Sequence, residues 1–370
     1  MGPSKLKIRY ATLFYGSLVF FLSLSLSQNA WADRLDIHCP AGDSLNDCVA
    51  EACANPEGGD VHLDEGVYDA NITAAINIEA NWPVAGVEPF GLCSGGVSII
   101  GRGIDKTILV STGPKIVSLP RFGQEPFVIN FPQALGIGSP GGQVEGPSEV
   151  QHLTIRCDAG STCPAFGVGI NNHVESGAIR HVRVEGFRRG IQLFANNGSA
   201  KHNILTGTGA EDTFGRGIFV ITSGFRLANI DISHNIISNF WRGIVVDSAD
   251  DVQVTHNIID DAAQGIFTQL LGGPFNVSHN YIAATDVGVL SILNAGDPDG
   301  SGDQGRFSNN LLCGSAQGFA FFESNTDLTV TKNVMLGTPR DSGFVFDDIV
   351  DPSEITLDKN LVLPQVQCPL

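Results

Sequence analysis

Basic side chains are scarce in this chain. Lysine and arginine together number 21 against 39 aspartates and glutamates, which gives a formal net charge of −18 at pH 7. Such an excess of acid repels nucleic acid and anionic membrane surfaces unless basic residues gather locally. Nucleic acid is therefore not expected as a partner, and a soluble protein or one that binds cations is favoured.

Segments long enough for helices that connect parallel strands are also lacking over most of the chain. The pattern there has period two, as in Ile230-Asp231-Ile232 and Val252-Gln253-Val254. This alternation predicts half-buried strands of about three to five residues. The sequence therefore favours an all-β protein over one with alternating helices and strands.

Residues 1–32 are expected to be a signal peptide. Lys5, Lys7 and Arg9 precede an apolar stretch, and Ala30-Trp31-Ala32 fits the small-x-small rule for cleavage before Asp33. An uncleaved membrane anchor is the alternative. Cleavage would leave 18 basic against 39 acidic residues, a net charge of −21. We therefore expect an exported protein (secreted, periplasmic or on the cell surface) with no membrane span after cleavage.

All eight cysteines follow this segment, at positions 39, 48, 53, 93, 157, 163, 313 and 368. An even number of cysteines in an exported chain favours disulfides, with buried thiols as the alternative for some. Their distribution predicts a four-cysteine cluster near the N-terminus and a local loop closed by Cys157 and Cys163. It also predicts a link between Cys313 and Cys368 that ties down the C-terminal tail.

An internal repeat is the dominant pattern. Seven segments have an asparagine followed by two apolar residues, and they alternate with glycines that are followed by an apolar residue. The asparagines are Asn203, Asn235, Asn257, Asn280, Asn310, Asn333 and Asn360, and the glycines are Gly169, Gly190, Gly217, Gly243, Gly265, Gly288, Gly318 and Gly343. A repeat of roughly 23 residues made of short strands predicts stacked three-stranded coils. Each asparagine is expected to occupy a left-handed corner and to hydrogen bond to the next one, and each glycine to open a strand at a sharp turn.

These residues resemble the repeat of the pectin-lyase-like parallel β-helix superfamily, from about Val150 to Leu363 and more weakly before that. The resemblance implies a right-handed parallel β-helix solenoid. Residues 33–110 are expected to hold the first coils and a capping helix that starts at the capping box Ser44–Asp47, with Gly59–Leu63 as the first strand. Residues 111–148 are expected to form a long loop excursion, and residues 149–370 the regular coils and the C-terminal tail.

Polysaccharide-active members of this superfamily bind substrate on the strand that here follows the glycine. Three coils carry Phe-x-Arg-Gly-Ile there, at Phe187–Ile191, Phe214–Ile218 and Phe240–Ile244. The phenylalanines are expected in the core. The arginines, Arg189, Arg216 and Arg242, are expected to stack about 5 Å apart. With Trp241 they are the predicted substrate-binding residues, because arginine grips carboxylate and sulfate.

Resemblance to acidic polysaccharide lyases further implies an arginine base, and calcium on the substrate carboxylate. The predicted catalytic residues are accordingly Arg216, Arg242 and Asp247, and Asp247, Asp250 and Asp251 are candidates to hold the cation. The alternative is structural: the arginines would pair with protein carboxylates, namely Glu211, Asp212, Asp260 and Asp261.

The outward positions of the same strands form an apolar strip, which an acidic sugar would not require. Its members are Gln192, Phe219, Val245, Phe267, Leu290, Ala320 and Val345. The strip favours a lid, for which residues 111–148 are the candidate, or an oligomer contact, or stacking on sugar rings. The Asp-Asp and Gly-His-Gly constellation of polygalacturonases is absent, as is the Asp-Pro-His signature of mannuronan epimerases.

Two further patterns suggest metal sites. Asp297, Asp299, Ser301 and Asp303 match the start of an EF-hand-like calcium loop, with a solvated, glycine-rich loop as the alternative. A histidine precedes four of the repeat asparagines, at His202, His234, His256 and His279. These histidines are expected to form a surface stack beside the repeat asparagines, with metal ligation as the alternative.

Two functions remain open from the sequence. The first is an exported carbohydrate-active β-helix protein that cleaves or modifies an extracellular, acidic polysaccharide as a lyase or glycoside hydrolase. The second is a non-catalytic β-helix protein that binds glycans or has a structural role at the cell surface or in the periplasm. Calcium is the one cofactor that the sequence suggests.

Overall fold

The computed structural model describes residues 34–69, 76–77, 95–111, 118–119, 123–124, 127–131, 148–157, 168–172, 176–209, 214–221, 226–271, 274–292, 305–323, 325, 327–348 and 350–368. The predicted signal peptide lies outside these residues, as do Cys93, Cys163, Glu211, Asp212 and the predicted calcium loop 297–303.

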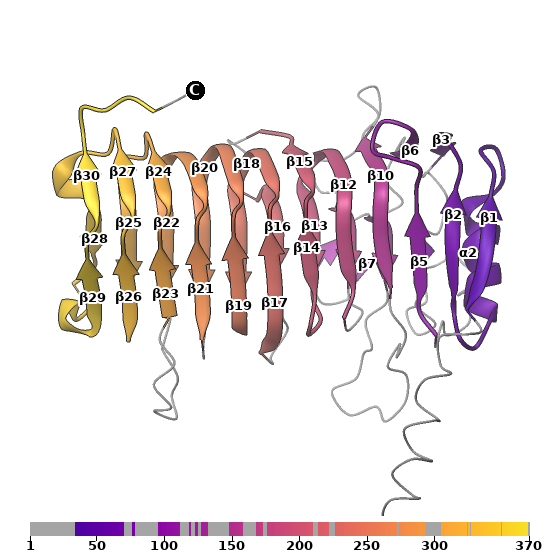
Figure 1. The fold of residues 1–370 in the computed structure, drawn as a ribbon, viewed down its shortest axis with the longest axis horizontal. Coiled ribbons are helices and arrows are strands. Elements are labelled where there is room, and N and C mark those ends of the chain that lie inside the picture. The colour runs from indigo at the N-terminus through magenta and orange to yellow at the C-terminus, as the bar shows by residue number, and fades with distance from the viewer. Residues whose placement is uncertain are drawn as a thin grey trace, which may run out of the picture.

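The strands form three parallel sheets that run the length of the stack (Figure 1). The first sheet contains, in spatial order, β1 (Leu35–Cys39), β2 (Gly59–Leu63), β5 (Val97–Ile100), β10 (Glu149–Cys157), β12 (Ala178–Phe187), β14 (Ser199–Lys201), β17 (Leu227–Ser233), β19 (Ala249–Thr255), β21 (Phe275–Ser278), β23 (Gly305–Ser308), β26 (Leu328–Thr331) and β29 (Ile355–Asp358).

The second sheet adjoins the first because β10 and β12 continue into it. It also contains β3 (Gly66–Asp69), β6 (Thr107–Ser111), β15 (Ile204–Gly207), β18 (Ile236–Asp247), β20 (Ile258–Gln269), β22 (Tyr281–Ile292), β24 (Leu311–Cys313), β27 (Val334–Leu336) and β30 (Leu361–Leu363).

The third sheet contains the second halves of β18, β20 and β22. Its other strands are β4 (Ile76–Asn77), β9 (Phe127–Phe131), β11 (Val168–Asn172), β13 (Arg189–Leu193), β16 (Arg216–Val220), β25 (Gln317–Phe322) and β28 (Phe344–Phe346). Outside the three sheets lie α2 (Leu45–Ala54), the hairpin of β7 (Ser118–Leu119) and β8 (Gly123–Gln124), and the 3-10 helices η1 (Arg340–Ser342) and η2 (Pro352–Glu354).

Apolar residues at equivalent positions of successive coils stack in the interior. Ile191, Ile218, Ile244 and Ile266 are all fully buried, as the repeat predicts. The repeat glycines are needed for space and not for a sharp turn. A Cβ on Gly243 would lie 2.4 Å from the Ile259 side chain and 2.7 Å from the carbonyl oxygen of Gly265. The close approach of the next coil therefore excludes any side chain there.

The repeat asparagines form a continuous buried hydrogen-bond ladder. The Nδ2 of Asn203 donates to the Oδ1 of Asn235 at 3.0 Å, and the same bond recurs from coil to coil up to Asn333 and Asn360. The prediction that each asparagine itself takes the left-handed conformation is wrong by one residue. The residue before each asparagine has the positive φ, for example His234 at 59° and Lys332 at 56°. This corner residue turns the chain, so that the asparagine which follows can point inward.

The N-terminal end of the stack begins one strand earlier than predicted. β1 precedes the helix and pairs with β2, so Gly59–Leu63 forms the second strand of its sheet. The side chain of Ser44 accepts a hydrogen bond from the backbone N–H of Asp47, and α2 packs Val49 and Ala52 into the interior at this end (Figure 1). A disulfide between Cys39 and Cys48 links β1 to the helix.

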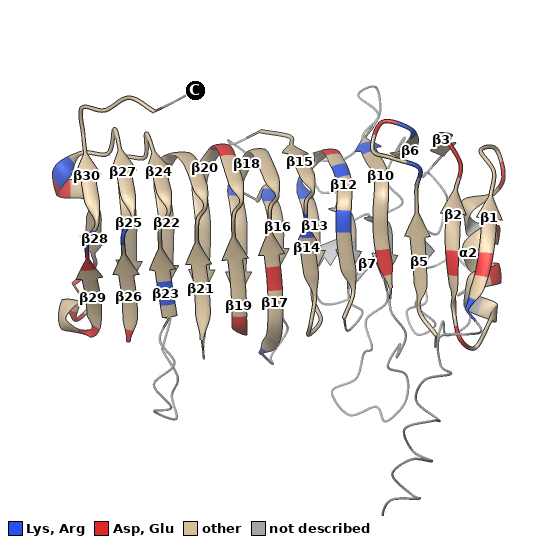
Figure 2. Ribbon diagram, viewed as in Figure 1, with Lys and Arg blue, Asp and Glu red and all other residues tan. Residues whose placement is uncertain are grey.

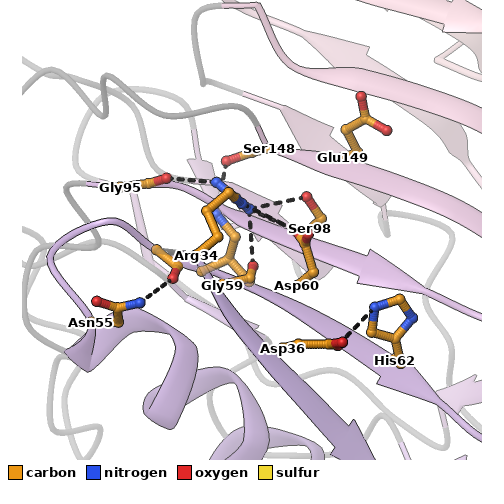
Figure 3. Close-up of polar contacts among 12 residues, drawn as sticks. Arg34, Asp36, Asn55, Gly59, Asp60, His62, Gly95, Ser98, Ser148 and Glu149 are labelled. Carbon is orange, nitrogen blue, oxygen red and sulfur yellow. Dashed lines mark hydrogen bonds and ion pairs between the residues drawn. The ribbon is translucent and has the colours of Figure 1, made fainter. Parts of the chain in front are cut away.

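Arg34 ties these first strands together (Figure 3). Its side chain is only 10% exposed and forms an ion pair with Asp60, 2.7 Å from Nη2 to Oδ1. It also donates to the carbonyl oxygens of Gly59 and Gly95 and to the Ser98 hydroxyl. One buried cation therefore bonds to β2, to β5 and to the residue that leads into β5.

The segment 111–148 is not wholly an excursion. β9 pairs in parallel with β4 and with β11, Ile129 lying opposite Ile76 and Ile170, so residues 127–131 belong to the third sheet. At the other end of the molecule a disulfide between Cys313 and Cys368 fixes the C-terminal tail against β24. Cys157 is also disulfide-bonded.

Candidate functional site

The three repeat arginines are neighbours in the third sheet. Arg189 lies opposite Arg216 on the next strand, and Arg216 lies opposite Arg242 on the one after. Gln264 continues the row on β20. Strand pairing therefore places three guanidinium groups on adjacent coils, as the sequence predicts.

Aromatic rings lie between these arginines. The guanidinium carbon of Arg216 is 4.6 Å from the ring centre of Trp241, and that of Arg242 is 4.2 Å from it on the same ring. Arg242 also lies 3.8 Å from the ring centre of Phe267, and Arg189 lies 5.2 Å from that of Phe219. Cation–π attraction of this kind stabilises closely spaced guanidinium groups. We call this set of six residues the arginine–aromatic column.

Arg242 is a partly buried member of the column. Its Nε donates to the Oε1 of Gln264 at 2.6 Å. Within the part of the chain that the structure describes, no carboxylate forms an ion pair with Arg242. The alternative expectation, that Asp260 or Asp261 would pair with it, is therefore not met. Burial lowers the pKa of Arg242 to about 10. Desolvation without a charged partner makes this guanidinium well suited to an anionic ligand.

The phenylalanines of the three motifs do not behave alike. Phe187 and Phe240 are buried, as predicted, but Phe214 is 58% exposed. Its ring lies under the guanidinium group of Arg188, 4.3 Å from centre to carbon. The prediction of a core role was therefore wrong for Phe214, which supports a cation at the surface.

Asp247 is on the same strand as Arg242 but not beside it. Five residues of extended strand separate the two, which is about 16 Å. Burial raises the pKa of the Asp247 carboxyl, while the hydroxyl of Ser248, which donates to it, opposes that rise. The structure thus brings Arg216 and Arg242 together with Trp241 and leaves the third predicted catalytic residue apart.

The predicted cation site near Asp247 is not assembled. Asp250 forms an ion pair with Arg226 at 2.9 Å. Among the described residues no group of three or more histidine, cysteine or acidic side chains is arranged to hold a metal ion. The predicted calcium ligands Asp297, Asp299, Ser301 and Asp303 lie outside those residues.

The apolar strip exists as a contiguous cluster beside the column, but it is not an open surface. Val245, Phe267, Leu290 and Ala320 are 2%, 4%, 7% and 0% exposed. Phe219 and Val345 pack against them and are partly buried. Because so little of the cluster reaches solvent, an oligomer contact through it has little area to bury.

The predicted histidine stack is longer than the four residues that the repeat marks. His152 and His181 precede His202 in the same column, and neighbouring rings are 4.8 to 5.1 Å apart, from centre to centre. The two were missed because no ladder asparagine follows them. Their left-handed φ values of 58° and 51° place them at the same corner as the others.

Comparison with known proteins agrees with this fold. Residues 166–337 match the family model of the right-handed β-helix region. The chain is a right-handed parallel β-helix protein. No curated protein sequence matches it.

Several solved structures share the architecture of this β-helix protein. The A-module of Azotobacter vinelandii mannuronan C-5 epimerase AlgE4 has a TM-score of 0.50 at 12% identity, covering 88% of this chain and 93% of that one. The corresponding AlgE6 module has a TM-score of 0.46 at 13% identity, covering 88% and 94%. The catalytic unit of a GH87 α-1,3-glucanase from Streptomyces thermodiastaticus has a TM-score of 0.43 at 14% identity, covering 89% and 67%. At these identities the likeness shows the fold alone.

Proposed function

We propose that this is an exported, carbohydrate-active β-helix protein which contacts an acidic polysaccharide through the arginine–aromatic column. The observation that carries the proposal is the setting of Arg242: a desolvated guanidinium, held between Trp241 and Phe267 without a described carboxylate partner. Solved proteins of this fold include modules named for action on mannuronan, itself a polysaccharide.

The column suits a polymer more than a small ligand. Its arginines recur once per coil, so that their spacing is the inter-strand distance of about 4.8 Å. Guanidinium groups grip carboxylate or sulfate in two-point geometry. Trp241 lies between Arg216 and Arg242 and is partly exposed, so a sugar can contact the edge of its ring. A linear chain of acidic sugars laid along the coils would meet both kinds of group.

Lyase-type cleavage is the specific activity that one observation favours. Burial brings the pKa of Arg242 down to about 10, so that its neutral form is more accessible than that of an ordinary arginine. A neutral Arg242 would take up the proton α to the sugar carboxyl, and the electron pair left behind would form a carbon–carbon double bond as the glycosidic oxygen leaves the adjacent carbon and takes a proton from water. The non-catalytic alternative needs only the contact surface.

The test is binding and turnover by the mature chain with polygalacturonate, alginate and neutral dextran. We expect both acidic polymers to bind and dextran not to bind. Arg242→Gln should weaken binding by about tenfold, the loss of one charge-assisted contact. Arg226→Gln is the matched control, since that arginine is exposed and already paired with Asp250. Absence of binding at every pH from about 5 to 10 would refute the proposal.

The same incubation distinguishes an enzyme from a binder. Elimination creates a carbon–carbon double bond in the new sugar end, which is followed by ultraviolet absorbance. Activity that rises with pH and is abolished in Arg242→Gln but retained in Arg226→Gln would support Arg242 as the base. Tight binding without product, at any pH and with or without added calcium, would establish the non-catalytic role.

Export is the remaining part of the proposal. The disulfides Cys39–Cys48 and Cys313–Cys368 support it, because such bonds persist in oxidising compartments. Within the described residues, none of the helices has the length and apolar character to cross a membrane. Mass spectrometry of the protein from culture medium or periplasm should find an N-terminus at Asp33. Retention of residues 1–32 in the purified protein would contradict cleavage.

A further inference from the structure

A second column of basic residues runs along the corner between the first and second sheets. One residue from each of nine successive coils sits there with a left-handed backbone, at φ values from 51° to 59°. They are His152, His181, His202, His234, His256, His279, Asn309, Lys332 and Lys359, and all are exposed. Eight of the nine are basic in a chain where acidic residues are nearly twice as numerous as lysine and arginine. We call this row the corner column.

The backbone conformation does not account for this composition. Left-handed positions favour Asn, Asp and His, among residues other than glycine. The described chain has ten other non-glycine residues with positive φ, and they are serine, asparagine, aspartate, leucine or glutamate. None of the ten is basic. The left-handed turn therefore accommodates the histidines, but it does not by itself explain why eight of these nine corners are basic and none of the ten other positions is.

Among the described residues, no carboxylate forms an ion pair with a histidine of the column. The described histidines outside it, His38 and His62, form ion pairs with Asp64 and Asp36 at 3.2 and 3.0 Å. No such pair involves any of the six stacked histidines within the described residues. The six rings instead stack on one another about 5 Å apart.

The charged groups on the first-sheet side of the column are largely paired among themselves. Arg180 forms an ion pair with Glu149, and Lys201 forms one with Asp231 at 2.6 Å. Of the two column lysines, Lys359 contacts Asp358 at 3.0 Å. Arg306 lies on β23, three residues before Asn309. On this side, the described carboxylates therefore do not form a row of ion-pair partners for the histidines.

The second-sheet side is mainly aliphatic. Ile236 and Ile258, each two residues beyond a column histidine, are exposed, and Tyr281 follows them in the same register. Arg183 pairs with Asp105 at 2.6 Å. Two acidic residues, Glu185 and Asp260, lie four residues beyond column histidines. Histidine rings beside exposed aliphatic side chains present both charge and apolar surface to a ligand.

We propose that the corner column is a binding site for a linear acidic polysaccharide, one that engages when the histidines are protonated. Charges that recur once per sugar ring along an extended glycan match a row of cations spaced at the coil repeat. With every histidine protonated, the row would hold eight cations, and histidine is the side chain whose ordinary charge change lies closest to neutral pH. Burial, together with the neighbouring His152 and Arg180, lowers the pKa of His181. Adjacent imidazolium groups then repel one another, and an anionic polymer laid between them removes that repulsion. This site lies on a different corner from the arginine–aromatic column and does not depend on it.

Nucleic acid fits this row less well. The phosphates of one duplex strand are about 3.4 Å apart along the helix axis, whereas the rings are 4.8 to 5.1 Å apart. A duplex would also approach the acidic remainder of the surface, where acidic and basic positions are scattered along the stack (Figure 2). Single-stranded DNA is accordingly one arm of the test.

The experiment measures binding of polygalacturonate, dextran sulfate, neutral dextran and single-stranded DNA at pH 7.5 and pH 5.5. The test variant carries His202→Asn, His234→Asn and His256→Asn, because Asn309 shows that asparagine is accepted at this corner. The matched control carries His38→Asn and His62→Asn, which removes titratable histidines outside the column. Circular dichroism and thermal unfolding check that each variant is folded. If the triple variant unfolds, His279→Asn with Lys332→Asn removes two cations at the other end.

We expect the acidic polysaccharides to bind about tenfold more tightly at pH 5.5 than at pH 7.5, the sum of several exposed charge contacts. The column variant should lose most of this gain and the His38/His62 control should keep it. Arg242→Gln should lower the affinity at both pH values and leave the increase in affinity between pH 7.5 and pH 5.5 intact. A failure of the arginine–aromatic column to bind is thereby distinguished from a failure of the corner column. An equal gain in the column variant, no gain in the natural chain, or a comparable gain for dextran or DNA would overturn the proposal.

Discussion

Replacement of Asn257 by alanine tests how much the ladder contributes to stability. This side chain lies in the middle of the ladder and takes part in four hydrogen bonds. Its Nδ2 donates to the Ile232 carbonyl at 3.0 Å and to the Oδ1 of Asn280 at 3.0 Å. Its Oδ1 accepts from the backbone N–H and from the Nδ2 of Asn235, at 3.0 and 2.9 Å. All of these groups are buried.

Not every lost bond leaves an unsatisfied group. The Nδ2 of Asn235 keeps the Ala200 carbonyl, and the Oδ1 of Asn280 keeps the backbone N–H of residue 257. The backbone N–H of Asn235 and the Ile232 carbonyl lose the bonds that the side chain made. Each buried group left without a partner costs about 1–3 kcal/mol. We therefore expect Asn257→Ala to lower the free energy of unfolding by about 4 kcal/mol.

Urea unfolding followed by circular dichroism measures this loss. Asn360→Ala is the matched control: it removes the last rung, which is only partly buried, so that water replaces the lost partner and the cost stays near 1 kcal/mol. Because solenoids can unfold coil by coil, thermal midpoints of both variants are compared as well. A loss below about 1 kcal/mol for Asn257→Ala, or equal losses at the two positions, would refute the assignment of stability to the buried ladder.

Two further outcomes follow from the structure. Asp247→Asn should stabilise the protein at pH 7, because a carboxyl whose pKa is raised in the folded state opposes folding once it is ionised. This gain in stability should disappear in acid, where the carboxyl is protonated in the folded and in the unfolded state. A gain that persists at about pH 3 would contradict the reasoning. Replacing Cys313 and Cys368 by serine opens a loop of 55 residues and should lower the free energy of unfolding by about 4 kcal/mol. The same change at Cys39 and Cys48, which are 9 residues apart, should lower it by about 2.6 kcal/mol. Denaturant unfolding without reductant measures both losses, and a larger loss for the Cys39–Cys48 pair would contradict the loop-closure argument.

The fold is predictable because its determinants recur. The ladder asparagines and the repeat glycines appear once per coil, so that a one-dimensional pattern is enough to identify stacked strands. The misplaced left-handed residue shows the limit of that reasoning. Asparagine does tolerate positive φ, but the ladder needs its amide to point inward from an ordinary strand. His234 takes the turn in its place, and only the hydrogen bonds between coils decide which of two adjacent residues does so.

The candidate site is less predictable because it depends on contacts between coils. Phe187, Phe214 and Phe240 occupy the same place in one motif, yet Phe214 lies outside the core under Arg188. Only one of the three motifs contains a tryptophan, Trp241, and its importance comes from its position between Arg216 and Arg242 on neighbouring strands. A sequence motif gives the order of residues within a coil. It does not give which ring of one coil covers which cation of the next.

Both basic columns follow from one property of a solenoid, that each position in the repeat becomes a line of side chains about 4.8 Å apart. A line of like charges opposes folding unless something separates or neutralises it. The arginine–aromatic column has aromatic rings between its guanidinium groups, and burial lowers the pKa of Arg242 to about 10. The corner column consists mainly of stacked histidine rings, and histidine is a residue type that gains its charge on protonation. The two columns thus avoid self-repulsion in different ways, so a polyanion should meet the first at any physiological pH and the second only when the medium is acidic.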